Sequence, residues 1–110
     1  MNQDIFIDQS SFREKVLKLR ADGYDFLRSL TGVDWGDEGL GVVYHLENTQ
    51  TQENIVLKTL TADRDNPQLY SVSDIWKGAE FNEREAFDYF GIRFIGHPDM
   101  RRLFLREDWV

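Results

Sequence analysis

The residues whose types could do chemistry gather in a short stretch near the C-terminal end of the printed sequence. Acidic, basic and imidazole side chains lie close together there: Glu83, Arg84, Glu85, Asp88, His97, Asp99, Arg101 and Arg102. Carboxylates with a histidine can bind a metal ion or transfer protons, whereas arginines bind carboxylates and acidic surfaces. We therefore consider a metal site, an acid–base site and a structural role for this stretch.

A metal site would use oxygen ligands and one imidazole, from Glu83, Glu85, Asp88, His97 and Asp99. Such a set could hold magnesium, manganese or iron. Glu83 and Glu85 are two residues apart on a predicted helix and therefore point in different directions. The neighbouring arginines would also repel a cation. The spacing thus disfavours a metal site.

An acid–base site would centre on His97 with a neighbouring carboxylate. The sequence offers no nucleophile and no phosphate-binding loop to complete such a site. In the structural interpretation, the charged side chains lock a helix to the following strand and present arginines to a partner. The residue types fit this third interpretation best.

Glu83 is predicted to lie on the apolar face of a helix. Its neighbours at offsets three, four and seven are Ala86, Phe87 and Phe90. A carboxylate in that position is costly unless it is paired, and an arginine from the 101–102 pair is the natural partner. Arg84 and Asp88 have the spacing of an ion pair on the helix surface, which would contribute well under ~1 kcal/mol.

Composition excludes several classes of protein. The chain has 110 residues, no cysteine and a formal charge of −7. Without cysteine it has no disulfides, no thiolate zinc site and no all-cysteine iron–sulfur cluster. The negative charge disfavours nonspecific nucleic-acid binding, no apolar run approaches the roughly 20 residues that span a bilayer, and the polar N-terminus does not resemble a signal peptide. We expect one soluble, cytoplasmic domain over residues 1–110.

The charge is unevenly distributed along the chain. Residues 1–90 carry a net charge of −8, whereas residues 91–106 carry four arginines and one acid. This arginine cluster either docks an acidic partner or pairs with the acidic helix before it, and the charge pattern leaves both open. Trp109 has no obvious core to join and is a candidate interface residue.

The N-terminal half is predicted to contain one helix and three strands. The helix spans 11–22, where Ser11 and Glu14 have the spacing of a capping box. The strands are expected at 29–35, 40–47 and 53–62. A short polar loop joins the last two strands, which predicts an antiparallel hairpin.

The C-terminal half is predicted to be a short turn, a helix and short strands. Ser71 or Ser73 could cap a helical turn that runs through Trp76. A helix follows from 79 to 90 and ends at Gly91. Short strands are expected at 92–95 and 103–105. This order predicts a two-layer α+β fold, with an antiparallel hairpin in a mixed sheet.

The motif resembles the signature of a known family. The run Glu83-Arg84-Glu85, the following Asp88 and His97, and then Arg101-Arg102-Leu103 is similar to the C subunit of bacterial NADH–quinone oxidoreductase. This family includes the 30-kDa subunit of mitochondrial complex I and the J subunit of the chloroplast complex. The resemblance extends from Asp25 to Trp109. Phe81 replaces a tryptophan usual in the family, and the family's Gly-x-Pro-Leu-Arg segment does not follow Trp109, so we expect a form without the C-terminal tail.

The resemblance implies a non-catalytic subunit in the peripheral arm of a proton-translocating respiratory complex, on the cytoplasmic face of the membrane. Such a subunit holds no cofactor itself; NADH, FMN, iron–sulfur clusters and quinone belong to partner subunits. It would dock on the hydrogenase-like large subunit and the iron–sulfur subunit. The motif residues would fix the fold and the contact surface. The alternative is the equivalent subunit of a membrane-bound hydrogenase or formate hydrogenlyase.

Overall fold

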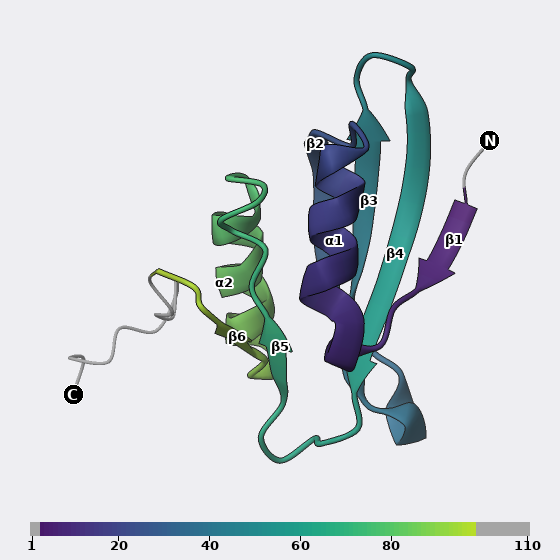
Figure 1. Cartoon of the computed structure of the whole chain (residues 1–110). Helices are drawn as coiled ribbons and strands as arrows, with labels where there is room; N and C mark the ends of the chain where they lie inside the picture. Colours follow the sequence, from purple (N-terminus) through teal and green to yellow (C-terminus); the bar gives the residue numbers. More distant parts are fainter. Residues whose placement is uncertain (1–2, 99–110) are drawn as a thin grey trace.

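The computed structural model describes residues 3–98 of the chain. Its N-terminal elements are β1 (Gln3–Phe6), the 3-10 turn η1 (Gln9–Ser11), α1 (Phe12–Ala21), β2 (Phe26–Asp34), the 3-10 turn η2 (Gly36–Glu38), β3 (Leu40–Asn48) and β4 (Glu53–Thr61). The remaining elements are β5 (Gln68–Tyr70), α2 (Ala79–Phe90) and β6 (Arg93–Ile95). Figure 1 shows α1 in front of a long sheet, with α2 and the short strands β5 and β6 beside the β2 edge. The predicted α+β fold is confirmed.

The main sheet has the strand order β1-β4-β3-β2. Strands β3 and β4 form the predicted antiparallel hairpin, with Leu40 opposite Thr61 and Asn48 opposite Glu53. The side-chain oxygen of Asn48 accepts hydrogen bonds from the amides of Gln50 and Thr51, at 3.0 and 3.2 Å. This local closure explains why the polar loop makes a tight connection between two apolar strands.

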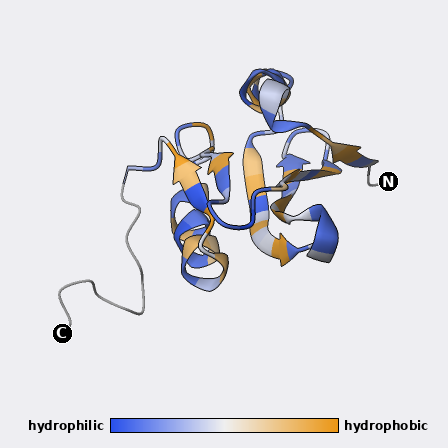
Figure 2. Ribbon diagram, turned by 90° about the horizontal axis from the view of Figure 1, so that it is seen from below, coloured by the Kyte–Doolittle hydropathy of each residue, from blue (hydrophilic) through white to orange (hydrophobic). Residues whose placement is uncertain are grey.

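One face of the sheet forms the core. On β3 the side chains of Val42, Tyr44 and Leu46 are fully buried because alternate residues of a strand point to the same face. Helix α1 covers this face with Phe12 and Val16, and the rings of Phe12 and Tyr44 lie 5.6 Å apart. Figure 2 gives the view from below and places α1 on one side of the strands.

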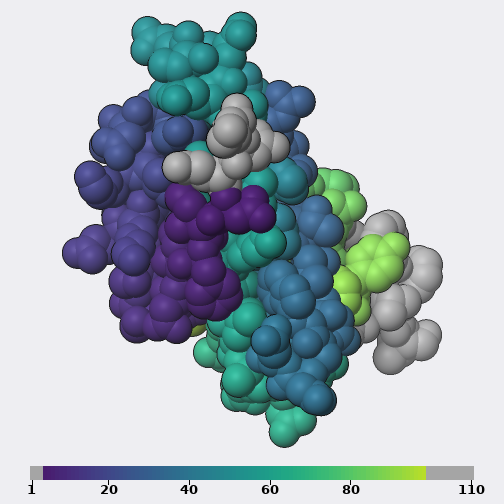
Figure 3. Space-filling model, turned by 90° about the vertical axis from the view of Figure 1, so that its right-hand side faces the viewer, coloured from purple at the N-terminus to yellow at the C-terminus, as the bar shows by residue number. Residues whose placement is uncertain are grey.

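Two strands were absent from the sequence prediction. Strand β1 runs parallel to β4, with Ile5 opposite Leu57, and makes the sheet mixed. Figure 3 looks onto this edge and shows β1, in purple, in front of the teal β4. Strand β5 pairs in parallel with β6. Both strands are short, and their partners lie far away in the sequence, so no local pattern marks them.

The start of α1 differs from the prediction. The capping box is wrong, because the side chain of Ser11 makes no capping hydrogen bond. Asp8 instead accepts from the Ser10 amide at 3.2 Å and begins the turn η1, so the chain is already helical before α1 starts. Strand β2 begins at Phe26, earlier than the predicted 29–35, and is irregular between Leu27 and Ser29.

Helix α2 has the predicted bounds. It spans Ala79–Phe90, and Gly91 ends it in a left-handed conformation, with its amide donating to the Phe87 carbonyl at 2.8 Å. The helix packs on β2 at Gly32, where a Cβ atom would lie 2.7 Å from the ring of Phe90. This close approach needs a glycine. No helix within residues 3–98 is long and apolar enough to cross a membrane.

Gly41→Ala should destabilise the fold strongly. A Cβ atom at this position in β3 would collide with the carbonyl oxygen of Thr59 and the ring of Trp35. We expect the free energy of unfolding to fall by about 2 kcal/mol or more, because the clash is with the backbone of the neighbouring strand. Urea denaturation measures the change. Gly78→Ala is the control, since nothing lies within 4 Å of its Cβ position; an equal loss in the two variants would contradict this account.

Candidate functional site

The predicted position of Glu83 on the inner face of α2 is confirmed. Its side chain is fully buried, and it shares this face with Ala79, Ala86 and Phe87. A carboxyl group in that environment needs hydrogen-bond donors, because it has lost its contact with water. Its partners therefore decide what this motif does.

Two donors on the segment after β5 bind the Glu83 carboxylate. The Ser71 hydroxyl donates to Oε1 at 2.7 Å, and the Val72 amide donates to Oε2 at 2.8 Å. The Nε2 atom of His97 lies 3.9 Å from Oε1. We call Glu83, Ser71, Val72 and His97 the Glu83 cluster; it joins the segment after β5, helix α2 and the turn after β6.

His97 is held against the first turn of α2. Its Nε2–H donates to the backbone carbonyl of Glu80 at 2.8 Å, and its side chain is 0% exposed. The His97 amide donates to the Phe94 carbonyl at 3.1 Å, which closes the turn after β6. His97 is thus a hydrogen-bond donor that fastens this turn to α2.

Helix α1 reaches the same segment through Arg13. The Arg13 guanidinium donates to the Ser71 carbonyl at 3.0 Å and to both carboxylate oxygens of Asp74, at 2.8 and 2.7 Å. These hydrogen bonds lower the pKa of Asp74. The Ser71 and Ser73 hydroxyls are also hydrogen-bonded, at 2.8 Å. Both helices therefore hold the segment 71–74.

Burial raises the pKa of Glu83 to about 7. The hydrogen bonds from Val72 and Ser71 oppose this effect, while the negative charges of Asp74 and Glu80 add to it. Burial, and secondarily the charge of Glu83, also raises the pKa of Tyr44 well above its usual value. The Tyr44 hydroxyl has no hydrogen-bond partner within residues 3–98. The interior around Glu83 thus disfavours negative charge.

A carboxyl with a raised pKa beside a histidine is also a pattern found in acid–base catalysis. A catalytic pair must reach its substrate, but the Glu83 and His97 side chains are both 0% exposed. Neither side chain lines the depressions around Arg28 and His45, around Gln9 and Tyr70, or around Gly32 and Tyr89. The geometry therefore favours a structural role for this pair.

The structure separates the remaining motif residues. Arg84, Glu85 and Asp88 are partly buried on other faces of α2. Within the described part of the chain, no three acidic, histidine or cysteine side chains come together where they could hold a metal ion. Asp99, Arg101, Arg102 and Trp109 lie outside the described residues, as does the predicted strand 103–105. The predicted arginine partner of Glu83 therefore stays a prediction, as does the Arg84–Asp88 pair.

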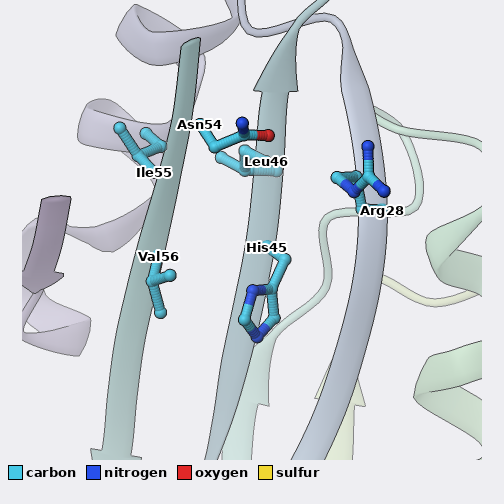
Figure 4. A pocket seen from close by; sticks show the side chains of 6 residues that line it. All are labelled: Arg28, His45, Leu46, Asn54, Ile55 and Val56. Carbon is cyan, nitrogen blue, oxygen red and sulfur yellow. The ribbon is translucent and has the colours of Figure 1, made fainter. Parts of the chain in front are cut away.

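A different depression lies on the sheet face opposite α1. It crosses three strands and is lined by Arg28, His45, Leu46, Asn54, Ile55 and Val56 (Figure 4). His45 alternates with the buried Tyr44 and therefore points away from the core. The His45 side chain is exposed. Arg28 is already paired with Glu47 at 2.6 Å.

Sequence reasoning missed the partners of Glu83 that the structure describes. One is a backbone amide, which carries no sequence signal. The other is Ser71, which the sequence indicated only as a possible helix cap. The signal that could have found it is the serine pair 71 and 73 ahead of an acidic helix, because hydroxyls at such positions bind nearby carboxylates and amides.

Glu83→Gln should remove a pH dependence of folding stability. The folded-state pKa of about 7 lies above the ordinary 4.5, so this group's contribution is fully present below pH 4.5 and is lost as pH rises through 7. The native chain should lose about 3 kcal/mol of unfolding free energy over this window. Glutamine stays neutral and can still accept a hydrogen bond from the Val72 amide. The unfolding free energy of the variant should therefore lack this loss over the same pH range. Urea denaturation from pH 4.5 to 8 measures both, and parallel curves would contradict the account.

Ser71→Ala should destabilise the chain by about 2 kcal/mol, because it removes a hydrogen bond to a buried carboxyl and leaves one oxygen unsatisfied. Thermal unfolding at fixed pH measures the loss. Ser10→Ala is the matched control, since the Ser10 hydroxyl is exposed and bonds only to the exposed Asp8 within the described residues. A control as unstable as Ser71→Ala would argue against a special role for the cluster.

Sequence comparison places the chain among respiratory proteins. Residues 5–110 match the family described as respiratory-chain NADH dehydrogenase, 30 Kd subunit. The C/D subunit of the NADH-quinone oxidoreductase of Phocaeicola vulgatus is 68% identical over 111 residues, which cover 100% of this chain and 21% of that protein. The chain therefore spans about a fifth of the length of the C/D relatives that it matches.

The fold also occurs in solved structures. The trypsin-resistant fragment (1-134) of Nqo5 superposes with a TM-score of 0.82 at 31% identity, covering 89% of this chain and 82% of that one. The membrane-bound sulfane sulfur reductase, an archaeal respiratory membrane complex, gives a TM-score of 0.83 at 28% identity and covers 97% of this chain and 64% of that one.

Proposed function

The chain belongs to the family of the respiratory-chain NADH dehydrogenase 30 Kd subunit, and on this basis we propose that it serves a proton-translocating NADH–quinone oxidoreductase as a non-catalytic part of the peripheral arm. The observation that carries this proposal is the burial of two motif residues, Glu83 and His97, away from any substrate. The hydrogen bonds of Glu83 and His97 hold the segment 71–72 and the turn after β6 to α2. Motif residues that are used for internal packing support a scaffold role for the chain.

The proposed partners are the hydrogenase-like large subunit and the iron–sulfur subunit of the arm, on the cytoplasmic face of the membrane. The double name C/D of the relatives supports this proposal, because in those proteins the matched region is about a fifth of a longer polypeptide. NADH, FMN, iron–sulfur clusters and quinone would be held by partner subunits. The absence of cysteine in the chain fits that division of labour.

The alternative is the equivalent subunit of a membrane-bound hydrogenase or formate hydrogenlyase. The fold alone does not distinguish the two functions, since the membrane-bound sulfane sulfur reductase shares it. The relative at 68% identity carries the NADH–quinone oxidoreductase name and favours the first function. An independent acid–base enzyme centred on His97 is disfavoured, because its side chain is 0% exposed.

Purification from a lysate of the native source tests the proposal. A tagged version of the natural full-length protein should bring down the hydrogenase-like large subunit and its neighbours, identified by mass spectrometry. Arg101→Glu or Arg102→Glu should reduce that recovery about tenfold, because each reverses a charge in the arginine cluster. The unfolding free energy should stay within about 0.5 kcal/mol of the native value.

Lys18→Glu is the matched control. It reverses an exposed charge on α1, where the side chain is 77% exposed, and should leave recovery unchanged. Recovery of hydrogenase subunits instead would favour the alternative function. A folded chain that recovers no respiratory subunit would refute the proposal, and an equal loss of stability and recovery in the arginine variants would make the cluster purely structural.

A further inference from the structure

The Tyr44 hydroxyl is a buried polar group that packing does not require. The side chain is 0% exposed, and within residues 3–98 its oxygen has no hydrogen-bond partner. Such a group costs free energy, because it has given up its contacts with water. The Tyr44 ring packs on the ring of Phe12, but a phenylalanine at position 44 would pack in the same way. The hydroxyl therefore needs an explanation of its own.

Leu30 of β2 connects the surroundings of Tyr44 with those of Glu83. Tyr44 is paired with Leu30, and both side chains are buried on the core face of the sheet. Leu30 also lines the depression between β2 and α2, together with Asn82, which precedes Glu83, and Ala86, which lies one turn after it. The negative charge of Glu83 accordingly acts on Tyr44. The unpaired hydroxyl and the buried carboxyl group thus belong to one stretch of the interior.

The donors that the structure describes around the Glu83 carboxyl group already have acceptors. The Ser71 hydroxyl donates to Oε1 and the Val72 amide donates to Oε2. His97 lies 3.9 Å from Oε1, but its Nε2–H donates to a backbone carbonyl of α2. An ionised carboxylate can accept about four hydrogen bonds. Ionisation of Glu83 in the interior therefore creates a need for a further donor.

The described charges around Glu83 make its ionisation costly. Asp74, on the segment after β5, and Glu80, on α2 itself, are acids that oppose a second negative charge. The Arg13 guanidinium of α1 donates to both carboxylate oxygens of Asp74 and to a backbone carbonyl. Arg84 follows Glu83 in the helix and therefore lies on another face of α2. A neutral donor is thus the group best placed to stabilise the carboxylate.

We propose that the Tyr44 hydroxyl is the donor that Glu83 takes up when its carboxyl group ionises, so that this core has two hydrogen-bonding states. In the neutral state Glu83 bonds to Ser71 and Val72, and the hydroxyl is unpaired within residues 3–98. In the ionised state Glu83 has released its proton to solvent, Tyr44 keeps its own proton, and the phenol O–H donates to the carboxylate. Because Tyr44 belongs to β3, this hydrogen bond ties α2 to the centre of the main sheet.

NMR of the chain with ¹³C at the tyrosine Cζ atoms tests the proposal, because this carbon responds to hydrogen bonding of the phenol. The chain has four tyrosines, and the Tyr44→Phe spectrum identifies the Tyr44 signal. Between pH 5 and 9 this signal should move in one step near pH 7, where Glu83 ionises. The signals of Tyr70 and Tyr89, which are 39% and 76% exposed, are references and should not show the step.

The step should vanish in Glu83→Gln, because glutamine does not ionise. A Tyr44 signal that stays flat in the native chain would overturn the proposal, and so would a step that survives in Glu83→Gln. If an arginine of the 101–102 pair supplies the donor to Glu83 instead, the Tyr44 signal stays flat.

A thermodynamic cycle separates a hydrogen bond from a field effect of the charge on the phenol. Tyr44→Phe keeps the ring, so at pH 5 it should change the unfolding equilibrium constant by less than about threefold. At pH 8.5 it should raise that constant about tenfold or more, because a hydrogen bond to a charged group is lost. Urea denaturation measures both values.

Two comparisons complete the cycle. In the Glu83→Gln background, the effect of Tyr44→Phe should be the same at both pH values, because no carboxylate forms there. Tyr70→Phe, at a position that is 39% exposed, is the control and should have the same effect at both pH values in the native background. If Tyr44→Phe behaves like this control, the Tyr44 hydroxyl does not bind the carboxylate and the proposal fails.

Discussion

A carboxyl group with no access to water is the constraint on which this end of the domain depends. Glu83 is fully buried, and a hydroxyl and a backbone amide satisfy its two oxygens. Because both donors lie on the short segment 71–72, their hydrogen bonds to Glu83 fix the position of that segment relative to α2. His97 connects the turn after β6 to α2 through its hydrogen bond to the Glu80 carbonyl. Arg13 connects α1 to the same segment through its hydrogen bond to the Ser71 carbonyl. Polar contacts thus join pieces that also pack through buried apolar side chains, among them Val72, Ile92 and Phe94.

This arrangement links the fold to the proposed function. The inner face of α2 is occupied by Glu83, Ala86 and Phe87, so the helix is fixed against β2 and the cluster. Its outer face is left with Phe81 and Tyr89, which no core contact requires to be aromatic. A rigid helix with an exposed aromatic surface is well suited to docking, because little conformational entropy is lost on binding. The hydrogen bonds of Glu83 and His97 thus hold α2 to the segment after β5 and to the turn after β6.

The parts predicted correctly from the sequence are those with local signals. Helix 79–90 was predicted with its bounds because Gly91 supplies the left-handed end, and the hairpin was predicted because two apolar runs flank a polar loop. Strands β1 and β5 were missed because their partners are distant in sequence. In the candidate site, helical spacing placed Glu83 in the core. Its partner Val72 could not be found in this way, because an amide is the same in every residue except proline.

The most direct test of this account is the titration of Glu83 itself. The side-chain carboxyl carbon of Glu83 can be followed by NMR from pH 3 to 9, with Glu14 as an exposed reference in the same chain. The account predicts a pKa of about 7 for Glu83, because the group is buried in the fold and has no water to stabilise its charge. A pKa at or below the ordinary 4.5 would show that the carboxylate is solvated or fully paired, and would contradict the central role given to its burial.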